Sequence, residues 1–297
     1  MAKDRYLQAL RGLAISAVVL IHCLPQCAAS VAIRPFLNFS VALFLFLSGV
    51  LTDERKFNAG GGLRRRISKV AGPYAFWSVI YLAAFPRPSW ASGFLAFAVG
   101  SVSAQMYYLL VYSQLVLLTP VLFRLLSRYR FFVYCVTPAC LLLRELAAVA
   151  GIALPLIQVF CPMWLIFYVF GLDWRRWAAL IEGRTTQLVA VLFIFLIIQE
   201  VAGFWWYLTG DFNMATTQLK LGSAATSLAV IALLMAVPGS FKSRLSSTLL
   251  VDLGNASFGI YLCHILVLKA VWKLLGLFVI PLGVSTFAVW ALTLAGS

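Results

Sequence analysis

Residues 6–24 read YLQALRGLAISAVVLIHCL, an apolar stretch long enough to cross a bilayer that is interrupted by two ionisable residues. Arg11 and His22 lie eleven residues apart, which at ~100° per residue returns a helix to within about 20° of its starting direction. The two side chains therefore share one helix face, ~16 Å apart along the axis. Because an ionisable group in lipid normally faces a bundle interior or a water-filled cavity, the stretch predicts a membrane helix that carries a functional site.

The composition places the whole chain in the membrane. Of its 297 residues, 63% are hydrophobic and 11% are charged, whereas soluble globular proteins have ~25% charged residues. Apolar runs of about the ~20 residues needed to cross a bilayer recur along the chain. We expect ten of them, at 6–24, 33–51, 70–85, 105–123, 131–151, 157–174, 187–207, 218–237, 256–275 and 278–295. The predicted fold is all-α, a polytopic transmembrane helix bundle of about ten spans in a single domain over residues 1–297.

The basic residues predict a topology. The net charge is +14, but Lys and Arg occupy short segments between apolar runs, so we expect no nucleic-acid partner. One alternating set of connections carries most of these residues, whereas the other set carries little beyond Arg34 and Arg87. Basic connections stay in the cytoplasm, so both termini are expected there. We expect a multi-pass protein of the cell inner (plasma) membrane.

The cysteines do not predict a metal site. Cys23 and Cys27 lie beside His22, but no third or fourth ligand follows at a suitable spacing. Most of the six cysteines lie in apolar surroundings, where a thiol behaves as a small hydrophobe. We therefore expect no metal.

Five motifs resemble, in their order, those of a known family. They are Arg11-Gly12 with His22, Phe44-Leu-Phe-Leu-Ser48-Gly49, Arg66-x-x-Lys69 before Pro73-Tyr74, the aromatic-rich span from Tyr107-Tyr108 to Pro120, and Ser257-Phe-Gly-Ile-Tyr261-Leu-Cys-His264. Together they resemble the acyltransferase 3 family, membrane-bound O-acyltransferases that act on cell-surface glycans. The resemblance spans nearly the whole chain.

Two positions depart from the family pattern. Gln8 stands where the family usually has an acidic residue, which removes a possible counter-ion for Arg11 three residues later. Lys69 replaces the second Arg of the basic pair, so it keeps the charge but loses the planar fork that grips a phosphate bidentately.

The resemblance implies transfer of an acyl group, often acetyl, from acyl-CoA on the cytoplasmic side to a hydroxyl of a cell-surface glycan or lipid-linked sugar. His22 would be the general base, because a neutral imidazole can take the proton of a hydroxyl that attacks a thioester. An interhelical hydrogen bond is its alternative role. Counted from Tyr6, His22 lies ~24 Å up a membrane ~30 Å thick, which suits an outward-facing acceptor.

Four further residues have roles that the resemblance implies. Arg11 would stabilise the developing oxyanion or hold a donor phosphate, and its alternative is to snorkel to the head groups. His264, one turn after Tyr261, is either a second proton carrier or part of a structural Tyr-His clasp between helices. Arg66 and Lys69 would bind the phosphates of CoA, whereas their alternative is to fix topology and bind anionic lipid.

The main alternative function is a transporter or exporter of a glycan or lipid-linked saccharide. Ten helices with buried charges would also form a translocation path, but we find no internal repeat and no paired Gly or Pro breaks in the two halves. We therefore expect an acetyl-CoA-dependent O-acetyltransferase. Its expected partners are acyl-CoA, a glycan or lipid-linked sugar acceptor, and membrane lipid.

Overall fold

The computed structural model describes residues 4–58, 61–275 and 282–297, and it is all-helical, with no strand within these ranges. The chain forms two compact units. One is made of Met1–Phe44 together with Trp174–Ser297 and is called the terminal unit below; the other is Leu45–Asp173, the central unit. The all-α prediction is confirmed for the described residues.

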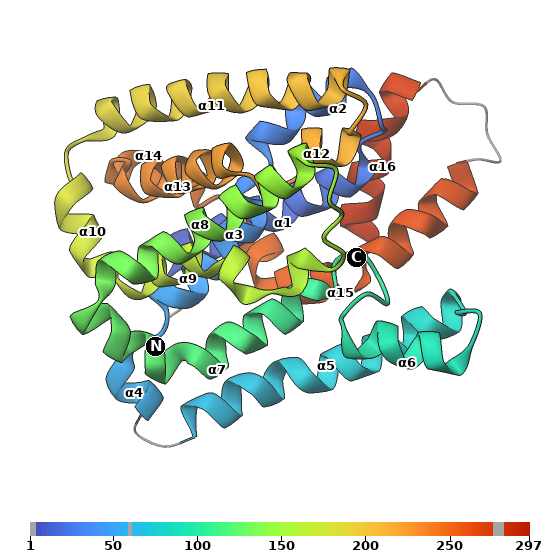
Figure 1. Cartoon of the computed structure of the whole chain (residues 1–297), viewed down its shortest axis with the longest axis horizontal. Helices are drawn as coiled ribbons and strands as arrows, with labels where there is room; N and C mark the ends of the chain where they lie inside the picture. Colours follow the sequence, from blue (N-terminus) through green and yellow to red (C-terminus); the bar gives the residue numbers. More distant parts are fainter. Residues whose placement is uncertain (1–3, 59–60, 276–281) are drawn as a thin grey trace. The chain divides into compact units, whose positions relative to one another are not determined.

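The terminal unit contains the helices from the two ends of the chain (Figure 1). Its elements are α1 (Arg5–Cys23), α2 (Ala28–Ile33), the 3-10 helix η1 (Arg34–Phe36), the first half of α3 (Phe39–Val50), α10 (Trp174–Ile181), α11 (Thr185–Leu208), α12 (Phe212–Thr216), α13 (Leu221–Ala236), α14 (Gly239–Leu245), α15 (Thr248–Leu275) and α16 (Leu282–Gly296).

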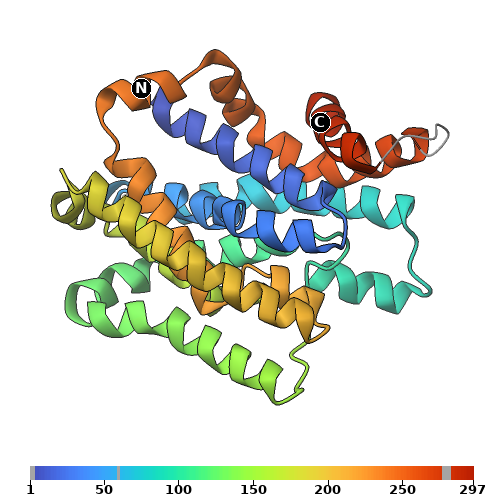
Figure 2. The same cartoon turned by 90° about the horizontal axis from the view of Figure 1, so that it is seen from above.

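The closest helix pair of the terminal unit is α1 with α15, which lie side by side in both cartoon views (Figures 1 and 2). A Cβ atom added to Gly12 would lie 2.0 Å from the carbonyl oxygen of Leu250, and one added to Gly254 would lie 1.9 Å from that of Gln8. Only glycine fits at these two positions, so the sequence lets the two backbones touch. Small residues at such contacts are typical of helices that pack in a membrane.

The central unit holds the middle of the chain. Its elements are the second half of α3, α4 (Glu54–Asn58), α5 (Gly62–Ala84), α6 (Trp90–Ala98), α7 (Tyr107–Arg128), α8 (Arg130–Val149), the 3-10 helices η2 (Ile157–Val159) and η3 (Cys161–Met163), and α9 (Leu165–Leu172).

A second glycine contact joins α3 to α9 inside the central unit. A Cβ atom on Gly49 would lie 2.3 Å from the carbonyl oxygen of Tyr168, and one on Gly171 would lie 2.1 Å from that of Phe46. The rings of Phe46 and Phe170 pack beside this contact with centroids 5.3 Å apart. Gly49 belongs to the Ser-Gly ending of the second predicted span, so that motif has a packing role here.

Seven described helices are long and apolar enough to cross a membrane. They are Arg5–Cys23, Ala28–Val50, Tyr107–Arg128, Arg130–Val149, Thr185–Leu208, Phe212–Ala236 and Thr248–Leu274. The predicted count of about ten is therefore not confirmed, and the side on which the termini lie stays a prediction.

The difference lies in three of the predicted runs. The run at 70–85 belongs to α5, whose first turns carry the basic residues 64–69. The run at 157–174 contains the two 3-10 helices η2 and η3 and only the short α9. The run at 278–295 falls partly outside the described residues, which include only the shorter apolar helix Thr286–Gly296 there.

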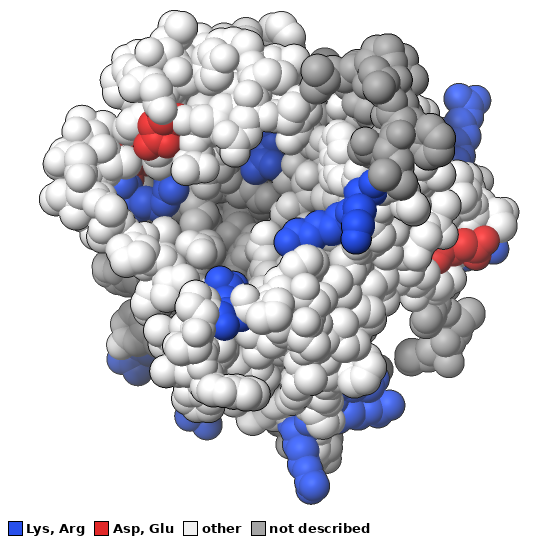
Figure 3. Space-filling view, turned by 90° about the vertical axis from the view of Figure 1, so that its right-hand side faces the viewer, with Lys and Arg blue, Asp and Glu red and all other residues white. Residues whose placement is uncertain are grey.

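The surface agrees with a lipid environment. Figure 3 shows a face that is mostly uncharged, with separate Lys and Arg side chains and fewer acidic ones. Large apolar side chains are widely exposed on the helices, among them Phe131, Phe193 and Leu143, each 64% exposed or more. An isolated soluble protein rarely exposes so much contiguous apolar surface.

A histidine pair as the candidate active site

The two histidines of the chain meet in the terminal unit. The rings of His22, in the last turn of α1, and His264, on α15, have centroids 5.2 Å apart and planes inclined by 47°. The helix contact explains the pairing. Gly12 and Gly254 each lie ten residues before a histidine, so α1 and α15 run in the same direction and reach the two rings after the same ~15 Å rise.

His264 is the inner member of the pair. Its side chain is 0% exposed, and its Nδ1 lies 3.1 Å from the carbonyl oxygen of Ile260 and 2.9 Å from that of Tyr261. Because a carbonyl can only accept a hydrogen bond, Nδ1 carries the proton in the neutral ring, and Nε2 keeps its lone pair. Nε2 is buried and has no hydrogen-bond partner among the described residues.

His22 is the outer member of the pair, because it is only partly buried. A molecule that enters the terminal unit would therefore meet His22 first and His264 behind it. The proximity of the two histidines was not predicted from the sequence, which assigned them to the first and ninth spans without a contact between them.

Arg11 and His22 keep the spacing that the sequence predicts. Both lie on α1, which is continuous from Arg5 to Cys23, and both side chains are partly buried. Nη1 of Arg11 donates to Oε1 of Gln8 at 3.4 Å, so Gln8 contacts the arginine from the position where a counter-ion was expected. The ~16 Å between Arg11 and His22 along the helix axis is longer than an arginine side chain. The Arg11 guanidinium therefore does not reach a substrate atom that reacts at His22.

The terminal unit also contains a partly buried cation that the sequence analysis did not select as a site residue. This cation is Arg34, the first residue of η1. Its Nε donates to the carbonyl oxygen of Thr216 at 3.1 Å. The sequence did distinguish Arg34 in one respect, because it is one of the two basic residues named in the connections that are predicted to lie outside the cytoplasm.

Arg66 and Lys69 lie on α5 in the central unit. Nη2 of Arg66 donates to the carbonyl oxygen of Leu51 at 3.1 Å, and the guanidinium lies over the ring of Phe57, 5.7 Å from its centroid. Lys69 is exposed. The two predicted donor-binding residues thus share a helix, with Arg66 held in place and Lys69 open to its surroundings.

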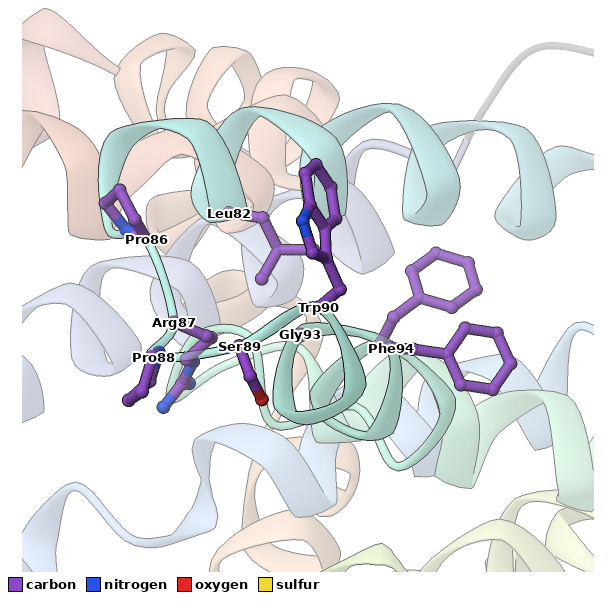
Figure 4. A pocket seen from close by; sticks show the side chains of 9 residues that line it. Leu82, Pro86, Arg87, Pro88, Ser89, Trp90, Gly93 and Phe94 are labelled. Carbon is purple, nitrogen blue, oxygen red and sulfur yellow. The ribbon is translucent and has the colours of Figure 1, made fainter.

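The central unit also contains a cavity of about 560 Å³ between the end of α5 and the start of α6. Leu82 and Trp90 lie between the two helices there, with Phe94 beside them and Arg87 in the connection (Figure 4). None of the predicted site residues lines this cavity, whose walls are mostly apolar. Among the residues that the structure describes, no three His, Cys, Asp or Glu side chains gather as a metal would require.

The fold and site define a class of protein: a multi-pass helical membrane protein with a histidine pair inside a bundle of apolar helices. Comparison with protein families identifies the class further. A model of the acyltransferase 3 family, described as an acyltransferase domain, matches residues 4–297. The chain belongs to this family, which confirms the resemblance seen in the motifs.

The family and the helices together make the chain a membrane acyltransferase, and this favours the enzyme over the exporter. No curated protein and no solved structure matches the chain.

Proposed function

We propose that this membrane acyltransferase transfers an acyl group, namely acetyl, from acyl-CoA to a hydroxyl of a cell-surface or lipid-linked glycan in the plasma membrane. His22 is the general base in this proposal. The observation that carries the proposal is the contact of the His22 and His264 rings at 5.2 Å. Helix packing alone does not require two imidazoles at one contact, and ionisable groups inside a membrane bundle are a functional signal.

His22 does the first proton transfer in this proposal. The acceptor hydroxyl oxygen attacks the thioester carbonyl carbon and gives its proton to a ring nitrogen of His22, while the carbonyl becomes an oxyanion. Collapse of the intermediate breaks the C–S bond, and the proton passes from His22 to the departing CoA sulfur. The partial exposure of His22 supports this role, because the base has to meet the acceptor.

His264 is proposed as a second proton carrier. With its proton on Nδ1 held by two carbonyl oxygens, the ring presents a lone pair at Nε2, which has no other partner in the described chain. A proton taken up by His22 then has a neighbouring acceptor inside the bundle. His264 also fixes the position of the His22 ring by contact.

Arg11 is proposed to hold a phosphate of the donor rather than the oxyanion. The pantetheine arm that joins the thioester of CoA to its diphosphate is about as long as four extended residues, or ~14 Å. This length is close to the ~16 Å between Arg11 and His22 along α1. A guanidinium at that distance suits the diphosphate end of the arm.

Arg66 and Lys69, on α5 of the central unit, are proposed to bind phosphate oxygens of acyl-CoA. The contacts of Arg66 with Leu51 and Phe57 fix its guanidinium, which lowers the entropy that binding has to remove. Lys69 supplies a mobile point charge.

The test is acetyl transfer by membranes that contain the wild-type chain, His22→Gln or His22→Ala, given labelled acetyl-CoA and the glycan of the host membrane. We expect the label in the glycan to fall by ~10²- to 10⁴-fold in both variants, the range that one general base contributes. Cys27→Ala, in the connection after α1, is the control that keeps the rate. Normal insertion with an unchanged rate in His22→Gln would refute the proposal.

A further inference from the structure

We infer that the cavity between α5 and α6 is a binding site for one anionic phospholipid, with an acyl chain inside the cavity and the phosphate on Arg87. The inference does not depend on the proposed function, because none of the residues proposed for acyl transfer lines the cavity. It follows from three features of the central unit: the size and walls of the cavity, the cation beside it, and the position of that cation at the end of α5.

The cavity has the size and the walls that one lipid chain requires. Its volume is about 560 Å³, and its apolar lining consists mainly of Leu82, Trp90, Phe94 and Phe97. A methylene group occupies about the volume of a water molecule, ~30 Å³, so this volume corresponds to ~19 such groups. The cavity therefore accommodates about one acyl chain of a membrane phospholipid.

The cavity is open to the surroundings of the protein, because two of its lining side chains are exposed. Trp90 is 97% exposed and Phe94 is 74% exposed, and Leu82 faces α6 from α5 (Figure 4). Apolar surface of this kind is rarely left in contact with water. Two helices of the same unit, α7 and α8, are long and apolar enough to cross a membrane, so lipid is the apolar molecule available to enter.

Of the described residues that line the cavity, Arg87 alone carries a charge. It stands between Pro86 and Pro88, whose rings fix φ at their own positions, and Pro88 also disfavours helical backbone at Arg87. Nη2 of Arg87 donates to the carbonyl oxygen of Ser101 at 2.7 Å, which orients the guanidinium. Because a guanidinium has five N–H donors, the fork keeps donors for the oxygens of a phosphate.

The other polar side chain of the lining is already in use. The hydroxyl of Ser89 accepts a hydrogen bond from the backbone N–H of Ser92 at 3.2 Å and so caps the start of α6. Arg87 is therefore the group of the lining that an anion would meet. A cation beside an apolar cavity matches an amphiphile, whose charged and apolar parts are joined.

The position of Arg87 suits the head-group layer of a bilayer. Arg87 follows the last turn of α5, whose second half is mostly apolar. Cationic and aromatic side chains at the end of an apolar helix segment lie at the membrane interface, and Trp90 is such an aromatic residue close to Arg87 in the sequence. A phosphate on Arg87 then lies in the head-group layer, with its acyl chain against the apolar walls of the cavity.

The test reconstitutes the full chain in phosphatidylcholine vesicles that contain a trace of phosphatidylglycerol or phosphatidylcholine with a photoactivatable group in the acyl chain. Mass spectrometry of peptides locates the label on residues 82–97, and this label is divided by the label on α11, whose sequence contains no Lys or Arg. We expect phosphatidylglycerol to label residues 82–97 about fivefold more than phosphatidylcholine does, the preference that one cation near a bilayer surface gives.

Two variants separate the parts of the site. Arg87→Gln should lower the phosphatidylglycerol label to the phosphatidylcholine level, whereas Arg65→Gln, an equal charge change near the start of α5, should leave it unchanged. Gly93→Leu should remove most of the label from both probes, because a Cβ atom on Gly93 has no neighbour closer than 3.8 Å and the longer side chain fills the cavity. Gly72→Leu adds the same side chain where nothing lies within 4 Å of the Cβ atom, and it should keep the label.

Three outcomes would overturn the inference. The first is equal label from both lipids in the wild-type chain, and the second is an unchanged phosphatidylglycerol label in Arg87→Gln. The third is competition by an unlabelled polyprenyl phosphate but not by unlabelled phosphatidylglycerol, which would assign the cavity to a lipid-linked sugar. If Gly93→Leu does not fold, Arg87→Gln decides, since Arg87 is exposed and its substitution leaves the apolar walls in place.

Discussion

The two units use the same device at their closest helix contacts and place different side chains beside it. A glycine on each helix lets α1 touch α15 in the terminal unit, and a glycine on each helix lets α3 touch α9 in the central unit. The first contact leads to the rings of His22 and His264, and the second lies beside the rings of Phe46 and Phe170. Both ring pairs have centroids just over 5 Å apart.

The glycine contacts of the two units are alike, and the proposed chemistry of the terminal unit depends on the side chains that lie in register with its contact. In the central unit, the polar groups near the contact satisfy each other, as in the hydrogen bond of 2.8 Å between the hydroxyls of Tyr168 and Thr119. In the terminal unit, Nε2 of His264 is buried with no partner in the described chain. An unsatisfied buried nitrogen is costly to folding, which indicates that function keeps it there.

The largest loss of activity that would distinguish the two units is expected on substitution of His264. His264→Asn keeps a side-chain donor for the carbonyl oxygens of Ile260 and Tyr261 and removes the ring nitrogen that faces the pair. We expect kcat for acetyl transfer to fall by ~10²-fold, at the low end of a general acid-base contribution. Steady-state rates on vesicle-reconstituted protein measure it.

Phe46→Leu, at the corresponding ring pair of the central unit, is the control for this substitution. It removes an aromatic contact of similar size and should lower stability while folded protein keeps its kcat. If His264→Asn transferred acetyl as fast as the wild type, both ring pairs would be structural only. The proposed role of His264 in acetyl transfer would then be wrong.

The next effect concerns the glycine contact of the terminal unit. Gly254→Ala would put a methyl group 1.9 Å from the carbonyl oxygen of Gln8, so α15 must move away from α1. We expect a loss of ~1–3 kcal/mol in stability, as for overpacking of a close contact, and a lower kcat per folded molecule because the histidine rings separate. Thermal unfolding and rates on the same preparations measure the two effects.

Gly259 gives the matched control on the same helix, because nothing lies within 4 Å of a Cβ added there. Gly259→Ala should leave the rate unchanged and raise stability by ~0.5–1 kcal/mol through helix propensity. Gly49→Ala, at the contact of the central unit, should lower stability alone. Equal losses of kcat per folded molecule in Gly254→Ala and Gly49→Ala would contradict the division between the units.

Much of the fold was predictable because a long apolar run predicts a membrane helix from one stretch of sequence alone, without knowledge of the helices around it. The first span, at 6–24, coincides with α1 (Arg5–Cys23) almost residue for residue. The prediction failed at 157–174, where the residues are apolar on average but the chain forms two 3-10 helices and the short α9 in place of one long helix. Average hydropathy depends on the residue types alone and carries no information on where a helix is interrupted.

The site was predictable only within one helix. Helical periodicity places Arg11 and His22 on α1, but the meeting of His22 with His264 depends on the register of two helices, which Gly12 and Gly254 set at positions far apart in the sequence. Arg34 was missed for a related reason. It lies in a connection, where a basic residue predicts topology, and its hydrogen bond with the Thr216 carbonyl oxygen joins residues 182 positions apart in the sequence.

A smaller effect tests whether the polar groups of the central unit are structural. Tyr168 is 0% exposed, and its hydroxyl donates to Thr119 Oγ1, which itself donates to the carbonyl oxygen of Leu115 at 2.9 Å. Tyr168→Phe removes one hydrogen bond and leaves Thr119 with a partner. We expect stability to fall by ~0.5–1.5 kcal/mol, measured by thermal unfolding, with kcat unchanged. A fall in kcat of tenfold or more would place chemistry in the central unit as well.

The smallest expected effect is a gain in donor affinity from a substitution in the central unit. Lys69 stands where the family has an arginine, is exposed on α5, and lies one turn after Arg66. Lys69→Arg restores a planar fork that grips a phosphate with two hydrogen bonds, so we expect the KM for acetyl-CoA to fall about threefold, or ~0.6 kcal/mol, with kcat unchanged. Arg64→Lys, on an exposed neighbour of the same cluster, should leave KM unchanged. A change in kcat, with KM constant, would mean that α5 acts on the reacting groups rather than on the donor's phosphates, and the proposed role of Lys69 in donor binding would not hold.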